Sequence, residues 1–363
     1  MTDTAVLARQ VRARLAGYED RFGALFEEYF RSLTATLDAP AFSRFTPECL
    51  ALVRDLSLRG GKRTRVALLF EAARLVTSDP VEGLDAAALS IELLQTHGLI
   101  HDDIIDDSPT RRGGPSTYYA YRERFPDQPK TALGLAVLAG DLAFGLCLQV
   151  LLDSKAPLPV RQAMVEAQLK AATDTFVGQI TDIERDFTPV PTQDVLHDVA
   201  EYKSARYSAL APLRLGLIAA GEDPAPFEKE LRRYARLVGI SGQMCDDYQD
   251  LFGDARAMGK PTGGDIREGR RNYTVSTLLA AASGPERAMV EAALGDGACS
   301  PETIDTIREI ALRRGVQKKI REDVQHYAQL AAAEAATWRP RWREEAVTFF
   351  ERLPVWSAER IMP

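Results

Sequence analysis

The chain has 363 residues and a net charge of −7, with 45% hydrophobic and 27% charged residues. This is the composition of an ordinary globular protein with enough apolar residues for a large core. The negative net charge argues against a nucleic-acid-binding surface, so any anionic ligand has to be captured by local clusters of basic residues.

Helical periodicity runs through almost every long segment, and no run of alternating β-branched residues predicts a strand. Helices are expected at residues 4–36, 47–57, 62–77, 84–107, 131–153, 159–187, 193–221, 226–253, 270–283, 301–314, 316–337 and 341–351. The breaks carry proline and glycine, and none is long enough for a flexible interdomain linker. The sequence therefore predicts one all-α domain over residues 1–363, with a tryptophan-containing tail at 338–363.

Pro212 lies inside the predicted helix 193–221. Because proline removes a backbone hydrogen bond, a kink is expected about one turn earlier, near Ser208. Such a kink would help to aim Lys203 and Ser204, just upstream, toward the interior.

The stretch from Thr131 to Leu152 is the most lipid-like part of the chain. Asp141 lies near its centre, where a charge is costly in a bilayer, so a core helix buried on all sides is expected instead of a membrane span. The first residues lack a basic region followed by an apolar one, so no signal peptide is expected. The four cysteines are widely spaced and form no CxxC pair, so neither a disulfide framework nor a zinc site is expected. A reduced, cytoplasmic protein is therefore expected.

An acidic DDxxD pattern occurs twice. The first copy is Asp102, Asp103 and Asp106, and the second, 144 residues later, is Asp246, Asp247 and Asp250. Both copies stand in predicted helices, where positions i and i+4 share a face. Carboxylates this close repel one another unless cations lie among them. A lone DDxxD is more often a solvated acidic face, but two copies predict a metal site assembled from two facing helices.

Basic residues near glycine accompany both acidic patterns. They are Lys62, Arg63 and Arg65 after Gly60-Gly61, Arg111 and Arg112 before Gly113-Gly114, and Lys260, Arg270 and Arg271. Such clusters suit diphosphates, because backbone N–H groups and helix N-termini add to the side-chain charge. Mg²⁺ is typically held by one or two carboxylates plus substrate phosphates, so a multi-ion cluster bridging both patterns and a diphosphate is expected. The resulting charge neutralisation makes the diphosphate a better leaving group.

At this point the sequence resembles a known family, the trans-isoprenyl diphosphate synthases or polyprenyl synthetases. The resemblance spans about residues 57 to 280 and rests on the motifs GGKRTR, LIHDDIIDDSPTRRGGP, AGDLA, GQITD, YKSARYSALAPL and GQMCDDYQDLFGD. The form of the YKSARY stretch is most similar to geranylgeranyl diphosphate synthases of actinobacterial type. The resemblance implies an isoprenoid-synthase-type helical bundle around a deep apolar cavity. It also implies a homodimer that joins isopentenyl diphosphate to an allylic diphosphate with Mg²⁺.

The resemblance also implies roles for individual residues. Metal binding would fall to Asp102, Asp103, Asp106, Asp246 and Asp250. Isopentenyl diphosphate would be held by Gly61, Lys62, Arg65, Gln95 and Arg112, and the allylic diphosphate by Arg111, Lys203 and Lys260. Ser204 and Gln243 would stabilise the developing allylic cation through their oxygen dipoles. The residues expected to be catalytic are Asp102, Asp103, Asp106, Lys203, Gln243 and Asp246.

Five positions depart from the family pattern. Val66 stands in place of a proline, and Arg270, in the substrate-binding set, in place of a lysine. Gly242 stands where an aromatic residue commonly precedes the glutamine, and Asn272-Tyr273 replaces a small residue followed by an aliphatic one. Most of these changes surround the second acidic pattern, so they bear on substrate size more than on reaction type.

Product length is expected to depend on the two residues four and five positions before the first aspartate, Gly98 and His97. In the family, bulk at these positions stops elongation. Glycine leaves space and histidine is of intermediate size, so the expected product is geranylgeranyl diphosphate. Farnesyl diphosphate and a C25 product are the alternatives.

Two other functions remain open at the level of sequence. A class I terpene cyclase should lack the isopentenyl site, whereas Lys62, Arg65, Gln95 and Arg112 are all present. A non-catalytic regulatory subunit typically loses one aspartate pattern, and this chain keeps both.

The remaining histidines and tryptophans are expected to be structural. His97, His197 and His326 lack metal-ligand spacing in the sequence. They are therefore expected to be core or surface residues. Trp338, Trp342 and Trp356 are expected to be packing anchors at the C-terminal end.

Overall fold

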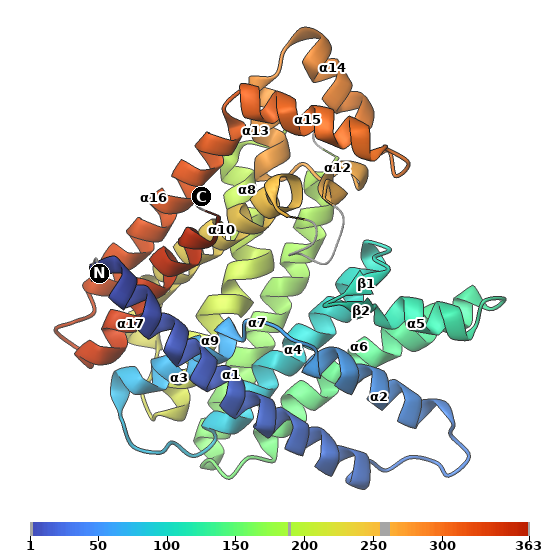
Figure 1. Ribbon diagram of the computed structural model, residues 1–363. Coiled ribbons are helices and arrows are strands. Elements are labelled where there is room, and N and C mark those ends of the chain that lie inside the picture. Colours follow the sequence, from blue (N-terminus) through green and yellow to red (C-terminus); the bar gives the residue numbers. More distant parts are fainter. Residues whose placement is uncertain (1–2, 188–189, 255–261, 362–363) are drawn as a thin grey trace. The chain divides into compact units, whose positions relative to one another are not determined.

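The protein is helical almost throughout. The computed structural model describes residues 3–187, 190–254 and 262–361. The ribbon consists almost entirely of helices (Figure 1). Contacts between residues divide the chain into two compact units, Met1–Lys170 with Ala211–Pro224, and Ala171–Leu210 with Ala225–Pro363. The all-α class predicted from periodicity is confirmed, whereas a single domain over residues 1–363 remains a prediction.

The first unit is built around one central helix, α4 (Leu84–Ile105). Residues 87–97 of α4 are all buried, which is the behaviour of a helix that has neighbours on every side. These neighbours include α3 (Thr64–Val76), α6 (Pro129–Leu152) and α9 (Ala211–Ala219). The unit also contains α1 (Asp3–Thr36), α2 (Phe45–Leu58), α5 (Thr117–Arg124) and the first part of α7 (Leu158–Arg185).

The second unit is organised by α10 (Glu228–Phe252), which packs against α13 (Tyr273–Ala281), α16 (Val316–Ala336) and α17 (Glu344–Ala358). Its other elements are α8 (Gln193–Val199), η1 (Ala200–Leu210), η2 (Ala225–Phe227), α12 (Gly264–Arg267), α14 (Gly284–Ala293), α15 (Pro301–Arg313) and η3 (Glu359–Ile361). Trp338 and Trp342 are buried, and the ring centroid of Trp338 lies 5.5 Å from that of Phe350. Both tryptophans are therefore the packing anchors that the sequence predicts.

The prediction of a single α-helix over residues 193–221 is wrong, because part of this segment has π-helical hydrogen bonds. The segment is α8, then the 11-residue π-helix η1, then α9. A π-helix uses i→i+5 hydrogen bonds and is often found at functional sites. Pro212 is the second residue of α9, so its missing N–H falls at the change from π to α geometry.

Helix α6 is long and apolar enough to cross a membrane, with a mean hydropathy of 2.1 in its most apolar window. It is buried on one face only, which corrects the expectation of burial on all sides. Ala132, Ala136, Ala139 and Ala143 are buried, whereas Leu138 and Asp141 are exposed. The buried face serves the packing of α6 against α4 and α5.

Several short elements escaped prediction. Ser116 caps the N-terminus of helix α5, because its Oγ accepts a hydrogen bond from the N–H of Tyr119 at 3.3 Å. Gly284-Pro285, expected to be a break, is the first turn of α14, a position that suits proline because its missing N–H has no partner there. Helix α17 continues through Pro354 to Ala358, seven residues beyond the predicted end.

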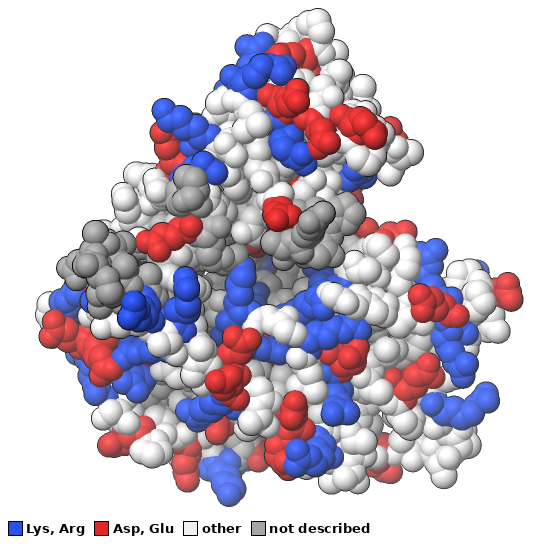
Figure 2. All heavy atoms as spheres, viewed as in Figure 1, with Lys and Arg blue, Asp and Glu red and all other residues white. Residues whose placement is uncertain are grey.

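Charges of both signs are mixed on the face of the molecule that Figure 2 shows. On the face in Figure 2, lysine and arginine lie interspersed with aspartate and glutamate among the described residues. This pattern agrees with the expectation that basic residues act locally and not through one broad positive field.

Candidate functional site

The first acidic pattern lies at the C-terminal end of α4, in the first unit. Asp103 is completely buried, and Asp102 and Asp106 are half-buried. Arg111 grips Asp103 with two guanidinium nitrogens, Nε at 2.7 Å and Nη2 at 2.6 Å from Oδ1. The same Nη2 lies 3.5 Å from Oδ2 of Asp102. One arginine thus balances two carboxylates of the pattern.

A tight hairpin positions Arg111. Strand β1 (Thr110–Arg111) pairs with β2 (Gly114–Pro115), and Arg112 and Gly113 between them both have positive φ, 51° and 76°. Two left-handed residues in a two-residue loop are the mark of a type I′ turn. Nη1 of Arg59 donates to the carbonyl oxygens of Arg111 at 3.0 Å and Pro115 at 2.7 Å, which holds the hairpin in place. Sequence reasoning missed this role of Arg59, since its only signal is one basic residue before the glycine pair.

Asp103 is poised to receive a cation. Burial raises the pKa of its carboxyl group to about 6, against the opposing effect of the Arg111 guanidinium. Its second oxygen, Oδ2, is buried and has no hydrogen-bond partner. A buried carboxylate oxygen of this kind, beside two further carboxylates, matches the oxygen ligands that Mg²⁺ prefers. The residues present therefore fit a magnesium ion.

The basic loop before α3 divides its charges between solvent and core. Lys62 is exposed and Arg65 is half-buried, whereas Arg63 is buried. Arg63 forms an ion pair with the buried Glu92 of α4 and donates to the carbonyl oxygen of Ser57 at 2.6 Å. Arg63 is thus used to attach the loop to α4, and it is not available to a ligand.

The guanidinium of Arg112 lies over the basic loop. A Cβ at Gly61 would be 3.2 Å from Nη2 of Arg112, so glycine permits this close approach. Burial lowers the pKa of Arg112 to about 10, which leaves it charged at neutral pH. Gln95, which is predicted together with Arg112 to bind isopentenyl diphosphate, is buried on α4.

Backbone strain gathers around these loops. Among the described residues, the non-glycine positions with positive φ are Arg63, Asp107 and Arg112. Such conformations cost about 1–3 kcal/mol each and persist where surrounding contacts impose them. All three belong to or follow the predicted basic and acidic motifs.

The second acidic pattern lies on α10, in the second unit, and its members differ in environment. Asp246 is exposed, whereas Asp247 and Asp250 are buried. Oδ1 of Asp247 accepts from Nε2 of Gln243 at 2.8 Å, and its Oδ2 accepts from the N–H of Tyr273 at 2.9 Å. Burial raises the pKa of Asp247, and the two hydrogen bonds oppose that effect. Asp247 therefore ties α10 to the start of α13.

The other buried carboxylate of this pattern supports the loop that follows. Oδ2 of Asp250 accepts from the N–H of Asp265 at 3.0 Å, and its backbone oxygen accepts from the N–H of Gly263 at 2.8 Å. Lys260, predicted to bind the allylic diphosphate, lies outside the described residues.

Ser204 and Gln243 are brought together as partners. The Ser204 hydroxyl donates to Oε1 of Gln243 at 3.2 Å, and the amide of Gln243 in turn donates to Asp247. This chain orients the Gln243 side chain through both ends of its amide. The serine oxygen keeps acceptor capacity for a developing positive charge.

Lys203 and Arg270 meet at Asp182 of α7. Nζ of Lys203 lies 2.5 Å from Oδ2 of Asp182, and Nη1 of Arg270 lies 3.3 Å from the same oxygen. Arg185 completes the cluster with an Nη1 2.7 Å from Oδ1 of Asp182. The close approach of η1 to α7 depends on Gly178, where a Cβ would be 2.2 Å from the backbone nitrogen of Lys203. Sequence reasoning left Asp182 out of the site, although the spacing D-x-x-R-D in a helix places these charges on one face.

The structure explains two departures from the family pattern. Asn272 caps α13, because its Oδ1 accepts from the N–H of Val275 at 2.9 Å while its amide donates to Oδ2 of Asp265 at 2.6 Å. The fork of Arg270 spans Asp182 and Glu268, the latter at 3.4 Å, which a lysine point charge does not do as readily. A Cβ at Gly242 would meet nothing within 4 Å, so this glycine leaves space along α10.

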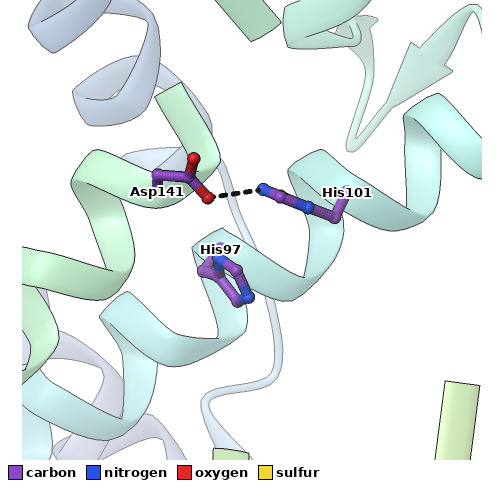
Figure 3. Close-up of side chains that lie close together, drawn as sticks. All are labelled: His97, His101 and Asp141. Atoms are coloured by element: carbon purple, nitrogen blue, oxygen red, sulfur yellow. Dashed lines mark ion pairs between the residues drawn. The ribbon is translucent and has the colours of Figure 1, made fainter. Parts of the chain in front are cut away.

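His97 is buried, as expected of a core residue, and it lies beside two other side chains that could bind a metal. His97 and His101 stand at i and i+4 on α4, and both approach Asp141 of α6 (Figure 3). Nδ1 of His97 is 3.0 Å from the carbonyl oxygen of Gly140, and burial lowers the pKa of the His97 ring. Beside it, Gly98 is half-buried, and a Cβ there would meet nothing within 4 Å.

Known proteins resemble this chain over most of its length. The family described as polyprenyl synthetase matches residues 46–311. The chain is 32% identical over 265 residues to a short chain isoprenyl diphosphate synthase of Methanothermobacter thermautotrophicus, covering 71% of this chain and 75% of the relative. It is 31% identical over 295 residues to a geranylfarnesyl diphosphate synthase of Natronomonas pharaonis, covering 73% and 81%.

A solved structure is also similar along almost the whole chain. It is the geranylgeranyl pyrophosphate synthase of Corynebacterium glutamicum complexed with isoprenyl diphosphate and magnesium, with a TM-score of 0.81 and 28% identity. The match covers 99% of this chain and 100% of that one. Products named among the relatives range from farnesyl through geranylgeranyl to geranylfarnesyl diphosphate.

The raised pKa of Asp103 predicts a pH dependence of stability in the absence of metal. Between the unfolded value near 3.8 and the folded value of about 6, the folded protein holds a proton that the unfolded chain has lost. The contribution of Asp103 to the free energy of unfolding therefore falls as the pH rises from about 4 to about 6, and it is constant above pH 6. In EDTA, the free energy of unfolding of the wild type should fall relative to that of Asp103→Asn over this range, as measured by urea denaturation. The exposed control Asp127→Asn should follow the wild type. If plots of the free energy of unfolding against pH are parallel for all three proteins, the pKa of Asp103 is not raised in the folded state.

Proposed function

Because the chain belongs to the polyprenyl synthetase family of trans-isoprenyl diphosphate synthases, we propose that it is a short-chain synthase whose main product is geranylgeranyl diphosphate. It joins isopentenyl diphosphate head to tail to an allylic diphosphate. The observation that carries this proposal is the buried Asp103, which has one oxygen on Arg111 and the other, Oδ2, without a partner. A carboxylate arranged in this way is suited to a metal ion that accompanies a diphosphate.

The aspartates bind Mg²⁺ in this proposal. In the first unit the ligands are Asp102, Asp103 and Asp106, and in the second they are Asp246 and Asp250. Bound Mg²⁺ would neutralise the diphosphate oxygens and so make the diphosphate a better leaving group. Asp247, with both oxygens engaged, acts by positioning α10 and Gln243.

The basic residues divide between the two substrates. Lys62, Arg65, Gln95 and Arg112 bind isopentenyl diphosphate, with Gly61 giving Arg112 its room. Arg111, Lys203 and Lys260 bind the allylic diphosphate, and Arg270 supports Lys203 through the shared Asp182. Lys62 is exposed, whereas Arg63 is buried and donates to the carbonyl oxygen of Ser57. This difference supports Lys62, and not Arg63, as a ligand of the diphosphate.

The reaction proceeds by ionisation, condensation and elimination. The allylic carbon–oxygen bond breaks, and the diphosphate leaves with the electron pair. The double bond of isopentenyl diphosphate then attacks the allylic cation, and the released diphosphate accepts the proton that is lost. Ser204 and Gln243 direct oxygen dipoles toward the cation, and their mutual hydrogen bond holds them in place.

A homodimer in the cytoplasm completes the proposal. In the second unit, α7 carries an exposed apolar stripe of Phe176, Ile180 and Ile183, with Phe187 following it. Their spacing of four, three and four residues places them on one helical face, and such a face on a lone protomer is typical of an interaction surface. A second copy of the chain is the partner that we propose for it.

Turnover and its metal requirement test the proposed function directly. The purified protein is incubated with Mg²⁺, isopentenyl diphosphate and either dimethylallyl, geranyl or farnesyl diphosphate, and the products are identified by mass. We expect prenyl diphosphates up to C20, no turnover in EDTA, and a rate about two to four orders of magnitude lower for Asp103→Ala. Loss of several kcal/mol of transition-state stabilisation, at about 1.4 kcal/mol per tenfold, accounts for that size. An Asp103→Ala variant within a few-fold of wild type would refute the metal assignment, and a cyclised hydrocarbon product would indicate a terpene cyclase.

The two diphosphate sites should separate kinetically. Lys62→Ala should raise the KM for isopentenyl diphosphate about 10- to 100-fold, and Lys203→Ala should do the same for the allylic substrate, because each loses one charged hydrogen bond. Steady-state kinetics with each substrate varied in turn measures both effects. Lys130→Ala, an exposed lysine on α6, is the matched control and should leave both constants unchanged. If both variants alter both constants equally, the two sites have been confused.

Product length should respond to Gly98. A Cβ there meets nothing within 4 Å, so Gly98→Phe can fold and place an aromatic ring in the space beside α4. The ring should shorten the product toward farnesyl diphosphate, since packed interiors have little slack to absorb it. Gly17→Phe, at another unobstructed glycine in the N-terminal helix, is the control and should leave the product unchanged. An active Gly98→Phe with the wild-type product distribution would show that this helix face does not limit elongation.

A further inference from the structure

Three side chains that could bind a metal lie together beside the first acidic pattern, and the proposed bond-breaking and bond-forming steps do not use them, although His97 is also expected to influence product length. His97 and His101 of α4 and Asp141 of α6 each offer a ligand atom, and these atoms all lie within 4.8 Å of one another (Figure 3). The two imidazole rings are 4.5 Å apart between centroids. At about 100° per residue, the histidine pair faces at least about 120° away from Asp102, Asp103 and Asp106. The cluster is therefore distinct from the aspartate pattern.

The His101 ring presents a buried nitrogen that lacks a partner. Its Nε2 has no hydrogen-bond partner and lies 3.5 Å from Oδ1 of Asp141. That distance is long for an N–H···O hydrogen bond. It is close to the separation of about 3.3 Å between two ligands on one tetrahedral zinc ion with bonds of about 2.0–2.1 Å.

The backbone of α6 is shaped to admit this ring. A Cβ at position 140 would lie 2.2 Å from Nε2 of His101, so only glycine leaves the ring its place. The carbonyl oxygen of the same Gly140 accepts a hydrogen bond from Nδ1 of His97 at 3.0 Å. Metal-binding histidines commonly donate one ring N–H to a backbone carbonyl, which orients the ring and leaves the other nitrogen to the ion.

The chemistry of the three ligands selects the ion. Mg²⁺ prefers oxygen ligands, whereas two imidazoles and one carboxylate suit Zn²⁺ and similar transition metals. The carboxylate of Asp141 is exposed, with 57% of its side chain accessible, so the ion can enter from solvent and keep a water in its fourth position. We propose that His97, His101 and Asp141 bind a zinc-type ion that joins α4 to α6, separately from the magnesium site.

The experiment uses the full-length protein, freed of metal with EDTA, dialysed and then saturated with Mg²⁺ to fill the aspartate sites. Zn²⁺ is titrated and followed by calorimetry and by the ¹⁵N resonances of the histidine rings. The chain has only four histidines, so each resonance can be assigned by substitution. We expect one equivalent of Zn²⁺ to bind and to shift His97 and His101, while His197 and His326 stay unchanged. Co²⁺ in place of Zn²⁺ should give the intense visible bands of a four-coordinate ion.

Matched variants locate the ion. His97→Gln and Asp141→Asn should each weaken Zn²⁺ binding at least about tenfold and abolish the cobalt bands. The exposed His326→Gln is the control and should bind as the wild type does. Circular dichroism checks the fold, and if His97→Gln is unfolded, Asp141→Asn decides alone because its side chain is exposed. Zn²⁺ that shifts neither His97 nor His101, or that binds equally well to Asp141→Asn and wild type, would overturn the proposal.

Discussion

The structure depends on how it neutralises carboxylates that it has removed from water. An isolated buried carboxylate is too costly to remain ionised, so each needs a cation or several donors. Asp103 forms an ion pair with Arg111, and Glu92 forms one with Arg63. Asp182 forms ion pairs with Lys203, Arg185 and Arg270. Most of these cations belong to the motifs proposed to bind substrate. The same charges therefore stabilise the fold and are suited to a diphosphate and its metal ions.

This arrangement accounts for the local backbone. The hairpin after α4 accepts a left-handed Arg112 because that turn brings Arg111 to Asp103, and Arg59 fastens it by two carbonyl oxygens. In the second unit, glycine at 178 allows the π-helix η1 to approach α7 closely enough for Lys203 to reach Asp182. Strain and unusual helical geometry are located where charged side chains must be aimed, as expected of functional segments.

The long helices could be predicted from sequence because an apolar stripe with a 3.6-residue period reports burial of one face. The ends of α1, α2, α4 and α15 lie within two residues of their expected positions. The short helices α5, α12 and α14 could not be predicted, since four to ten residues hold too few turns for a period. The π-helix was missed for a different reason: its i→i+5 bonds leave no distinct mark on the pattern of apolar residues. Helix α6 was expected to be buried on all sides because its composition is apolar throughout, and composition does not reveal which face has a neighbour.

By itself the sequence determined the helical class, the family and the motifs proposed to carry the reaction, because these follow from residue types at fixed local spacing. The tertiary structure alone decided how equivalent letters divide their work. Of neighbouring aspartates, Asp246 faces solvent and Asp247 is held by a side-chain amide and a backbone N–H from a distant segment. Of neighbouring basic residues, Lys62 is exposed and Arg63 is buried against α4. The meeting of His97 and His101 with Asp141 likewise required the packing of α6 on α4. Burial and partners are properties of contacts between remote segments, and local spacing does not contain them.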